Sequence, residues 1–521
     1  MTVQMNLAAR LDAAQRFFDS GRLDAAAQQL EAVLQSDPGH GDALEGLAYI
    51  ALRQGQPAEA AAYFERALAV LPPDAERLGA AGMAHQAAGN HARAVALLDQ
   101  AGAQGPRQAG ALHAAAMSLS ALGDHAGALE RLRQVAAWQP GSWEVHYNMG
   151  RALGLLERYE EEAEAYRRAI ERKPDSADAH ANLGVALAEL HRFDEALRLF
   201  KKALQLDPNN AGARANRAST NLLLGQFEHG WREYEWRWRS GAQPHHGLSG
   251  EPWLGDKPLA GKTLLLHSEQ GFGDTLQFVR YVERLAGSGA TLVLRVQDAL
   301  CTLLEGYAGV AAVIGRSEPL PPYDYHCPLM SLPLALWKAA PQIPDRVPYL
   351  QADPARRAEW TSWLGPRARP RVGIAWAGSA TNLNDRNRSM RLQDWAPLLA
   401  APADFIALQK DPRPGDLAAW QELPALRDAA PGLHAFRDTA ALVAELDLVI
   451  CVDTAVAHLA GALGKPAWIL LPFTPDWRWQ LARGDSPWYP GTRLFRQPRR
   501  GDWAPVMAQV QAALRERLAE S

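Results

Sequence analysis

Small and large apolar residues recur with a period of 34 over the first 240 residues of the chain. Counting back from a repeated proline, position twelve is alanine in five of six copies, and position eight is always leucine or an aromatic residue. Position twenty-four is always alanine or glycine. This pattern predicts a pair of helices per copy that approach closely at small residues around one large core residue. The prolines that close the copies are Pro38, Pro72, Pro106, Pro140, Pro174 and Pro208.

A second repeated position marks the end of the first helix of each pair. Seventeen residues before the proline, four copies have glycine, and the other two have Glu157 and His191. Glycine adopts the left-handed conformation that often ends a helix, and proline cannot continue the second helix. Glu162 is the exception at the alanine position.

A seventh copy begins near residue 211 and ends in an aromatic segment, residues 231–238, without the expected proline. Trp231, Tyr234 and Trp238 share one helical face by their spacing. We interpret this segment as an end cap that packs onto the next domain. An aromatic platform for a ligand is the alternative.

Beyond a linker at 241–258 the period changes from helical to alternating strand and helix. Six short apolar runs predict strands, and their alternation with helices predicts parallel sheets. We therefore expect an α solenoid at 1–240, then two Rossmann-like α/β domains at 259–366 and 367–521, with a final helix crossing between the domains. Their site should lie at the carboxyl ends of the strands. The predicted strands are 262–267, 291–296, 371–376, 405–409, 446–452 and 467–471.

Composition excludes several classes of function. The net charge of −4 offers no general attraction for nucleic acid or an anionic membrane. Three cysteines in 521 residues indicate a reducing compartment, and the chain shows neither a signal peptide nor an apolar run long enough to span a bilayer. We expect a soluble cytoplasmic protein. No glycine-rich dinucleotide or P-loop motif follows a strand, which disfavours nicotinamide and P-loop chemistry.

The 34-residue units resemble the tetratricopeptide repeat. The loop Gly271-Phe272-Gly273-Asp274 and the element from Asp453 to Ala462 resemble the heptosyltransferase-like GT-B glycosyltransferases. Segments 384–389, 477–479 and 486–490 are similar to a subgroup in which repeats precede the transferase, and which includes flagellin glycosyltransferases. The resemblance implies a nucleotide-sugar donor and a polypeptide acceptor, flagellin by class, held by the repeats.

The candidate base is Asp274, which ends the glycine loop formed with Gly271 and Gly273, at the carboxyl end of a strand. Sugar transfer requires a base near the acceptor hydroxyl, and a carboxylate at this edge reaches the cleft. The alternative is that Asp274 only caps the helix predicted from Thr275.

The donor phosphate is expected at a second helix start. The N–H groups of Thr454 and Ala455 favour an anion there, His458 lies one turn further, and Arg388 or Lys410 would balance Asp453. Helix capping and a half-buried imidazole are the alternatives for Asp453, Thr454 and His458.

No Asp-x-Asp element or His/Cys cluster follows a strand of this half, so we expect transfer without a metal or other cofactor. A nucleoside diphosphate sugar and a CMP-linked nonulosonic acid both remain open as donor. Two other functions also remain open. One is a heptosyltransferase-like enzyme acting on lipopolysaccharide or another glycan, and the other is a peptide-binding scaffold with an inactive transferase half.

Overall fold

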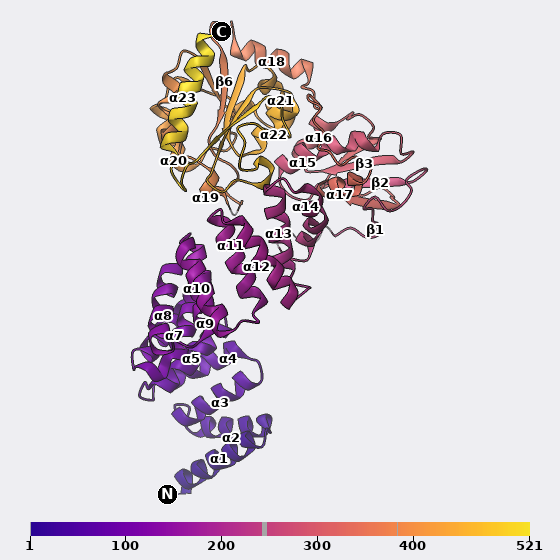
Figure 1. Cartoon of the computed structure of the whole chain (residues 1–521). Helices are drawn as coiled ribbons and strands as arrows, with labels where there is room; N and C mark the ends of the chain where they lie inside the picture. Colours follow the sequence, from indigo (N-terminus) through magenta and orange to yellow (C-terminus); the bar gives the residue numbers. More distant parts are fainter. Residues whose placement is uncertain (1, 242–246, 383, 521) are drawn as a thin grey trace. The chain divides into compact units, whose positions relative to one another are not determined.

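The computed structural model describes residues 2–241, 247–382 and 384–520, with side chains from residue 7 onward (Figure 1). The chain divides into two compact units, Met1–Ala213 and Arg214–Ser521. The break falls inside the seventh copy of the repeat.

The first unit consists of antiparallel helix pairs, as the 34-residue period predicts. Each proline follows the second helix of a pair, and Pro106 also opens a 3₁₀ turn. The helices are α1 (Thr2–Asp19), α2 (Leu23–Ser36), α3 (Gly41–Arg53), α4 (Pro57–Leu68), α5 (Ala75–Ala87), α6 (His91–Gly102), η1 (Pro106–Gln108), α7 (Ala109–Ala121), α8 (His125–Trp138), α9 (Trp143–Leu155), α10 (Tyr159–Arg172), α11 (Ala177–Glu189) and α12 (Phe193–Leu206).

The repeated small residues are required by helix contact. A Cβ added at Gly150 would lie 2.7 Å from the Tyr166 ring, and one at Gly184 would lie 2.7 Å from the Phe200 ring. Both are closer than a real Cβ contact allows, so glycine is required at this position in these two copies.

The residues that end the first helices have positive φ in all six copies. Gly123 has φ 83°, and the two exceptions, Glu157 and His191, both have φ 58°. The expected left-handed conformation is therefore kept even where the residue is not glycine.

The seventh repeat continues as α13 (Ala211–Leu223), α14 (Phe227–Tyr234) and the 3₁₀ turn η2 (Glu235–Trp238). Trp231 is fully buried, with its ring 5.2 Å from Trp477 and 6.0 Å from Phe278 in the α/β region. Tyr234 also contacts Trp477, at 6.0 Å. The expected end cap is confirmed, since this face packs onto the α/β region.

The first α/β sheet is wholly parallel, in the order β1-β5-β2-β3-β4. Strand β1 lies inside the segment expected to be only a linker, of which residues 242–246 are outside the described residues. Its elements are β1 (Glu251–Pro252), β2 (Thr263–His267), α15 (Phe272–Phe278), η3 (Val279–Leu285), β3 (Thr291–Val296), α16 (Asp298–Leu304), β4 (Ala312–Gly315), β5 (Tyr325–Pro328), η4 (Leu329–Ser331) and α17 (Leu332–Trp337).

The second sheet is also parallel, in the order β11-β10-β9-β6-β7-β8. Strands β6, β9 and β10 are buried along their whole length, as expected for strands covered on both faces. Its elements are α18 (Pro354–Leu364), β6 (Arg371–Ala375), α19 (Asp385–Arg388), η5 (Leu392–Trp395), η6 (Leu398–Ala400), β7 (Asp404–Ala407), α20 (Pro414–Gln421), β8 (Leu426–Asp428), η7 (Ala430–Gly432), α21 (Phe436–Ala444), β9 (Leu448–Val452), α22 (Ala455–Ala462), β10 (Ala467–Leu471), η8 (Trp477–Trp479), β11 (Thr492–Arg496) and α23 (Ala504–Ala519).

The final helix, α23, packs on the second sheet, and its expected crossing between the domains stays a prediction. Val506, Val510 and Leu514 are buried in the hydrophobic core of the second sheet, and α23 runs beside that sheet (Figure 1). The apolar face of α23 is therefore buried against the core of the second sheet.

Candidate functional site

The candidate site lies where a helix that follows a strand of the first sheet meets a helix that follows a strand of the second sheet. Helix α15 follows β2 and carries Asp274, and α22 follows β9 and begins just after Asp453 and Thr454. The two helices pack against each other (Figure 1). A Cβ at Gly273 would lie 2.7 Å from His458 Cδ2, so glycine permits this approach. On the same junction, the Phe272 and Phe436 rings are 4.9 Å apart.

Asp274 lies in the first turn of α15, because the helix begins at Phe272 rather than at Thr275. Its Oδ2 accepts a hydrogen bond of 2.7 Å from the Gly271 N–H, which closes the helix start. Asp274 is therefore not the N-cap residue of the alternative interpretation, although it does satisfy a backbone donor. Burial raises the pKa of Asp274 above its ordinary value, against the opposing effect of the Arg478 guanidinium.

Arg478 makes the central contacts of the site, although the sequence pattern predicts no role for it beyond its place in the segment 477–479. Its guanidinium forms an ion pair with Asp274 Oδ1 and donates to Gln277 Oε1 at 2.6 Å and to Asp476 Oδ1 at 2.8 Å. Arg478 lies in η8, after β10, and 204 residues separate it from Asp274. A cation between two tryptophans just beyond a strand end is the only local signal in the sequence that points to it.

Asp453 and Thr454 occupy the start of α22, as expected. Thr454 is the N-cap residue with extended backbone, φ −147° and ψ 170°, and within the described residues its side chain makes no capping hydrogen bond. Arg388 Nη1 donates to the Asp453 carbonyl oxygen at 2.9 Å. Burial, and then Asp476, raise the pKa of Asp453 to about 6, while Arg388 acts in the opposite direction. Arg388 is thus beside Asp453, but it contacts the backbone rather than the carboxylate.

His458 is buried and has partners within the protein. Its Nδ1 lies 3.0 Å from the Tyr489 hydroxyl, and its ring stacks on Trp479 with centroids 5.3 Å apart. Burial, reinforced by three arginines, lowers the pKa of His458 well below its ordinary value, so the imidazole is neutral. These contacts match the interpretation of a satisfied imidazole, and a role in ligand binding stays a prediction.

Lys410 is placed differently from the other candidates. Its side chain is exposed and donates to the His434 carbonyl oxygen at 3.1 Å. Gly271, Gly273, Asp274 and His458 come together at the α15–α22 junction, with Arg388, Asp453, Thr454 and Ala455 at the start of α22.

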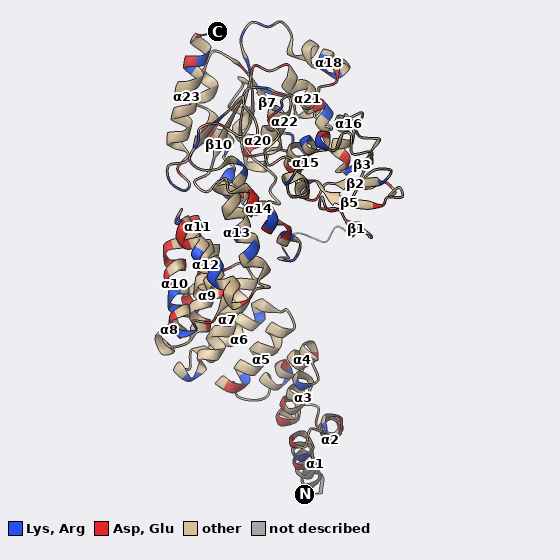
Figure 2. Ribbon diagram, turned by 45° about the vertical axis from the view of Figure 1, so that its right-hand side comes forward, with Lys and Arg blue, Asp and Glu red and all other residues tan. Residues whose placement is uncertain are grey.

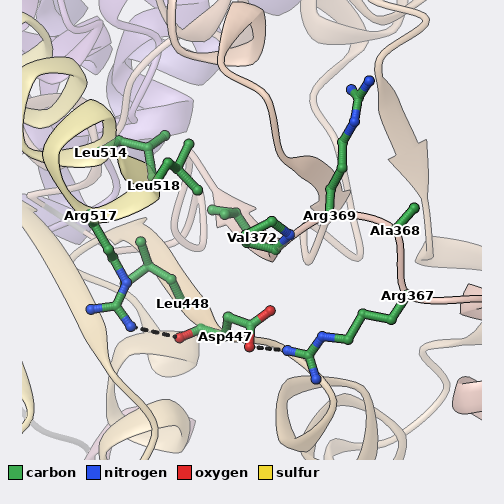
Figure 3. Close-up of a pocket in the computed structure, with 10 residues that line it drawn as sticks. Arg367, Ala368, Arg369, Val372, Asp447, Leu448, Leu514, Arg517 and Leu518 are labelled. Atoms are coloured by element: carbon green, nitrogen blue, oxygen red, sulfur yellow. Dashed lines mark hydrogen bonds and ion pairs between the residues drawn. The ribbon is translucent and has the colours of Figure 1, made fainter. Parts of the chain in front are cut away.

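A cavity of about 370 Å³ lies at the opposite edge of the second sheet, where β6 and β9 begin (Figure 3). Arg367 pairs with the Asp447 carboxylate there, and Arg517 reaches the Asp447 carbonyl oxygen at 3.4 Å. Because it lies at the amino ends of the strands, this cavity is separate from the candidate site.

Charge is distributed without a single dominant sign on the repeat helices. Figure 2 shows both signs on α10 and α12. In the part of the chain that the structure describes, no helix is long and apolar enough to cross a membrane. The described residues also contain no group of three His, Cys, Asp or Glu placed to hold a metal ion.

Family comparisons match both halves of the chain. Tetratricopeptide repeat models match residues 11–76 and 113–177, 51–117, and 177–210. The glycosyltransferase family 9 (heptosyltransferase) model matches residues 431–483. That second match contains α22, Asp453, Thr454, His458 and Arg478, and it supports a glycosyltransferase.

Individual proteins are similar over part of the chain. Protein FlbA of Caulobacter vibrioides is 31% identical over 328 residues, which cover 58% of this chain and 54% of FlbA. Cellulose synthase 1 operon protein C of Komagataeibacter xylinus is 42% identical over 59 residues, 11% of this chain and 4% of that protein.

Among solved structures, that of Pseudomonas aeruginosa pilF is 17% identical, covers 42% of this chain and 99% of its own, and has a TM-score of 0.34. The chain spans about half the length of FlbA and far less of the cellulose synthase operon protein. The chain therefore combines a tetratricopeptide-repeat solenoid with a parallel α/β region that contains a glycosyltransferase family 9 match.

Proposed function

We propose that the chain is a cytoplasmic protein glycosyltransferase of GT-B type. It transfers a sugar from a nucleotide-activated donor to a Ser or Thr hydroxyl of a polypeptide. The observation that carries this proposal is the family 9 match at 431–483, which falls on the helix start and the arginine that adjoin Asp274.

Each group has a defined role in this reaction. The acceptor oxygen forms a bond to the anomeric carbon as the bond from that carbon to the donor phosphate breaks. Asp274 takes the hydroxyl proton, and two hydrogen bonds to its carboxylate leave lone pairs to do so. The departing phosphate is stabilised by the uncapped start of α22 and by Arg388.

The acceptor is proposed to be a polypeptide because tetratricopeptide arrays present extended surfaces for peptide or protein partners. Flagellin is the proposed acceptor class, on the resemblance to repeat-containing flagellin glycosyltransferases. The alternative acceptor is a glycan, which would replace the polypeptide in this proposal. Radiolabelled sugar recovered in lipopolysaccharide rather than in protein would establish it.

Two measurements test the activity. A thermal-shift panel of UDP-, GDP-, ADP-, dTDP- and CMP-sugars should reveal a donor, since a ligand that binds only the native state raises its melting temperature. Mass spectrometry of a co-expressed flagellin should then show added sugar with the wild-type chain and none with Asp274→Asn. Binding of no nucleotide sugar would favour a scaffold with an inactive half, and full transfer by Asp274→Asn would remove Asp274 as the base.

We also propose that transfer needs no metal, because Arg388 and helix N–H groups neutralise the leaving phosphate. Activity should therefore persist in EDTA. Loss of activity that Mg²⁺ or Mn²⁺ restores would contradict this mechanism.

A further inference from the structure

Arg478 is built into the junction from several sides. The residue is 5% exposed, and its guanidinium lies 4.2 Å from the Trp477 ring centroid. Its backbone carbonyl accepts a hydrogen bond of 3.0 Å from Trp488 Nε1. The backbone and side chain are thus both fixed, and the charged head has little freedom to move.

The guanidinium reaches across to two residues of α15. Nε donates to Gln277 Oε1 and Nη2 pairs with Asp274, so the planar fork contacts two residues one turn apart on one helix. Asp476 holds Nη1 from the other side. Asp274 is consequently oriented by two donors, the Gly271 N–H within its own helix and Arg478 from the second α/β domain.

We propose that Arg478 is the positioning residue for Asp274, so that the base is oriented only while the segment around η8 is packed against α15. The proposal rests on the proposed function, because it concerns the residue assigned as the base. It gives the junction a further role, since the second domain then completes the acceptor side of the site as well as holding the donor.

The charged groups facing Asp274 define what a change at Arg478 should do. Arg478 lowers the pKa of Asp274, Asp476 raises it, and Asp274 in turn raises the pKa of Glu269 in the preceding loop. His458, packed against the adjoining Gly273, is neutral. Burial makes the pKa of Asp274 higher in the native state than in the unfolded chain. The free energy of unfolding therefore falls as the pH rises from the unfolded pKa to the native pKa. Removing Arg478 should extend that loss to higher pH.

A second buried arginine provides a matched control. Arg237 is 3% exposed and donates to both carboxylate oxygens of Glu269, at 2.7 and 2.8 Å. It pairs with the same loop, but it does not contact Asp274. Its loss should destabilise the protein and should change the titration of Asp274 less than the loss of Arg478, because it acts on Asp274 only through Glu269.

The experiment uses the full chain with Arg478→Lys, Arg478→Gln or Arg237→Gln. Each variant is made with and without the additional substitution Asp274→Asn, which gives one pair of proteins per arginine variant. The difference in melting temperature within each pair, followed against pH, reports the titration of Asp274. The proposal expects the upper end of this titration to move to higher pH in Arg478→Gln, and to move less in Arg237→Gln. An unmoved titration in Arg478→Gln overturns it. If that variant does not fold, Arg478→Lys carries the same comparison, because a single ammonium does not reproduce the fork, and a smaller upward shift is expected.

A rate measurement distinguishes positioning from stability. The probe is hydrolysis of each donor in the panel of UDP-, GDP-, ADP-, dTDP- and CMP-sugars, in which water takes the place of the acceptor hydroxyl and the released nucleotide is measured. Arg478→Lys should lower kcat at least about ten-fold with a smaller change in KM, as expected for a misoriented base. A kcat of Arg478→Lys equal to that of the wild type overturns the positioning role of Arg478 but leaves the proposed function in place. A wild-type chain that neither binds nor hydrolyses any of these donors removes the proposed function, and the role of Arg478 as a positioning residue with it.

Discussion

Glu162 is a buried carboxylic acid at a position that the other five aligned copies give to alanine. Gly154 makes room for it, since a Cβ there would lie 2.7 Å from Glu162 Oε1, and Oε2 has no hydrogen-bond partner in the described structure. Burial, with Glu189 adding to it, raises the pKa of Glu162 to about 8. The native state therefore holds a proton that the unfolded chain loses above pH 4.5, and stability falls as the pH rises from 4.5 to about 8.

Glu162→Gln should remove this dependence. The variant should gain stability relative to the wild type as the pH rises, reaching about 3 kcal/mol at pH 7 as an upper value. Denaturant titrations of the full chain at pH 5 and pH 8, followed by helical circular dichroism, measure the change. The exposed neighbour Glu160, changed to Gln, is the control. An equal gain at both pH values would contradict a buried, protonated Glu162.

Asp453 should also make the protein less stable as the pH rises, but over a lower pH range than Glu162. Its pKa rises from 3.8 to about 6 on folding, so its contribution to stability falls between these pH values. Asp453→Asn should therefore gain up to about 3 kcal/mol relative to the wild type between pH 4 and pH 7. Arg388→Gln should extend the wild-type decline above pH 6, because Arg388 opposes the shift. Denaturant titrations measure these changes, and Asp345→Asn, at an exposed position, is the control. If the difference in unfolding free energy between Asp453→Asn and the wild type did not change with pH, a raised pKa of the buried Asp453 would be contradicted.

At the scale of elements, the ends of the repeat helices need a left-handed residue more than they need glycine. Gly123 and Glu157 occupy equivalent positions with φ 83° and 58°. Glu157→Gly should stabilise the repeats by about 0.5–1 kcal/mol, and Gly123→Ala should destabilise them by about 1 kcal/mol or more. Urea titrations of both variants test the pair. Loss of stability in Glu157→Gly would mean that contacts of the glutamate outweigh its backbone strain.

The elements were predictable from the sequence where the pattern is local and repeated. The structure has strands at the predicted positions 291–296 and 467–471, and the aromatic face of residues 231–238 packs as an end cap. Strand β1 was missed because two residues show no alternation, and they become a strand only by pairing with β5. Arg478 and Asp274 form an ion pair across 204 residues of sequence. Only the tertiary structure brings them together, so no local spacing in the sequence predicts the pair.

For the whole molecule, the stability of the α/β region should depend on the last repeat helix. Helix α14 and η2 place Trp231 against Trp477 and Phe278, and Arg237 against the buried Glu269 carboxylate. A fragment of residues 211–521 keeps these contacts, whereas a fragment of 259–521 exposes the aromatic rings and leaves Glu269 without its cation. We expect the longer fragment to unfold cooperatively, and the shorter one to melt at least about 10 °C lower and to bind a hydrophobic dye, because loss of a buried tryptophan and a buried ion-pair partner each costs about 3–5 kcal/mol. Scanning calorimetry of both fragments, with Trp231→Ala in the longer one as an intermediate case, measures the effect. Equal melting temperatures for the two fragments would show that the α/β region is complete without its helical cap.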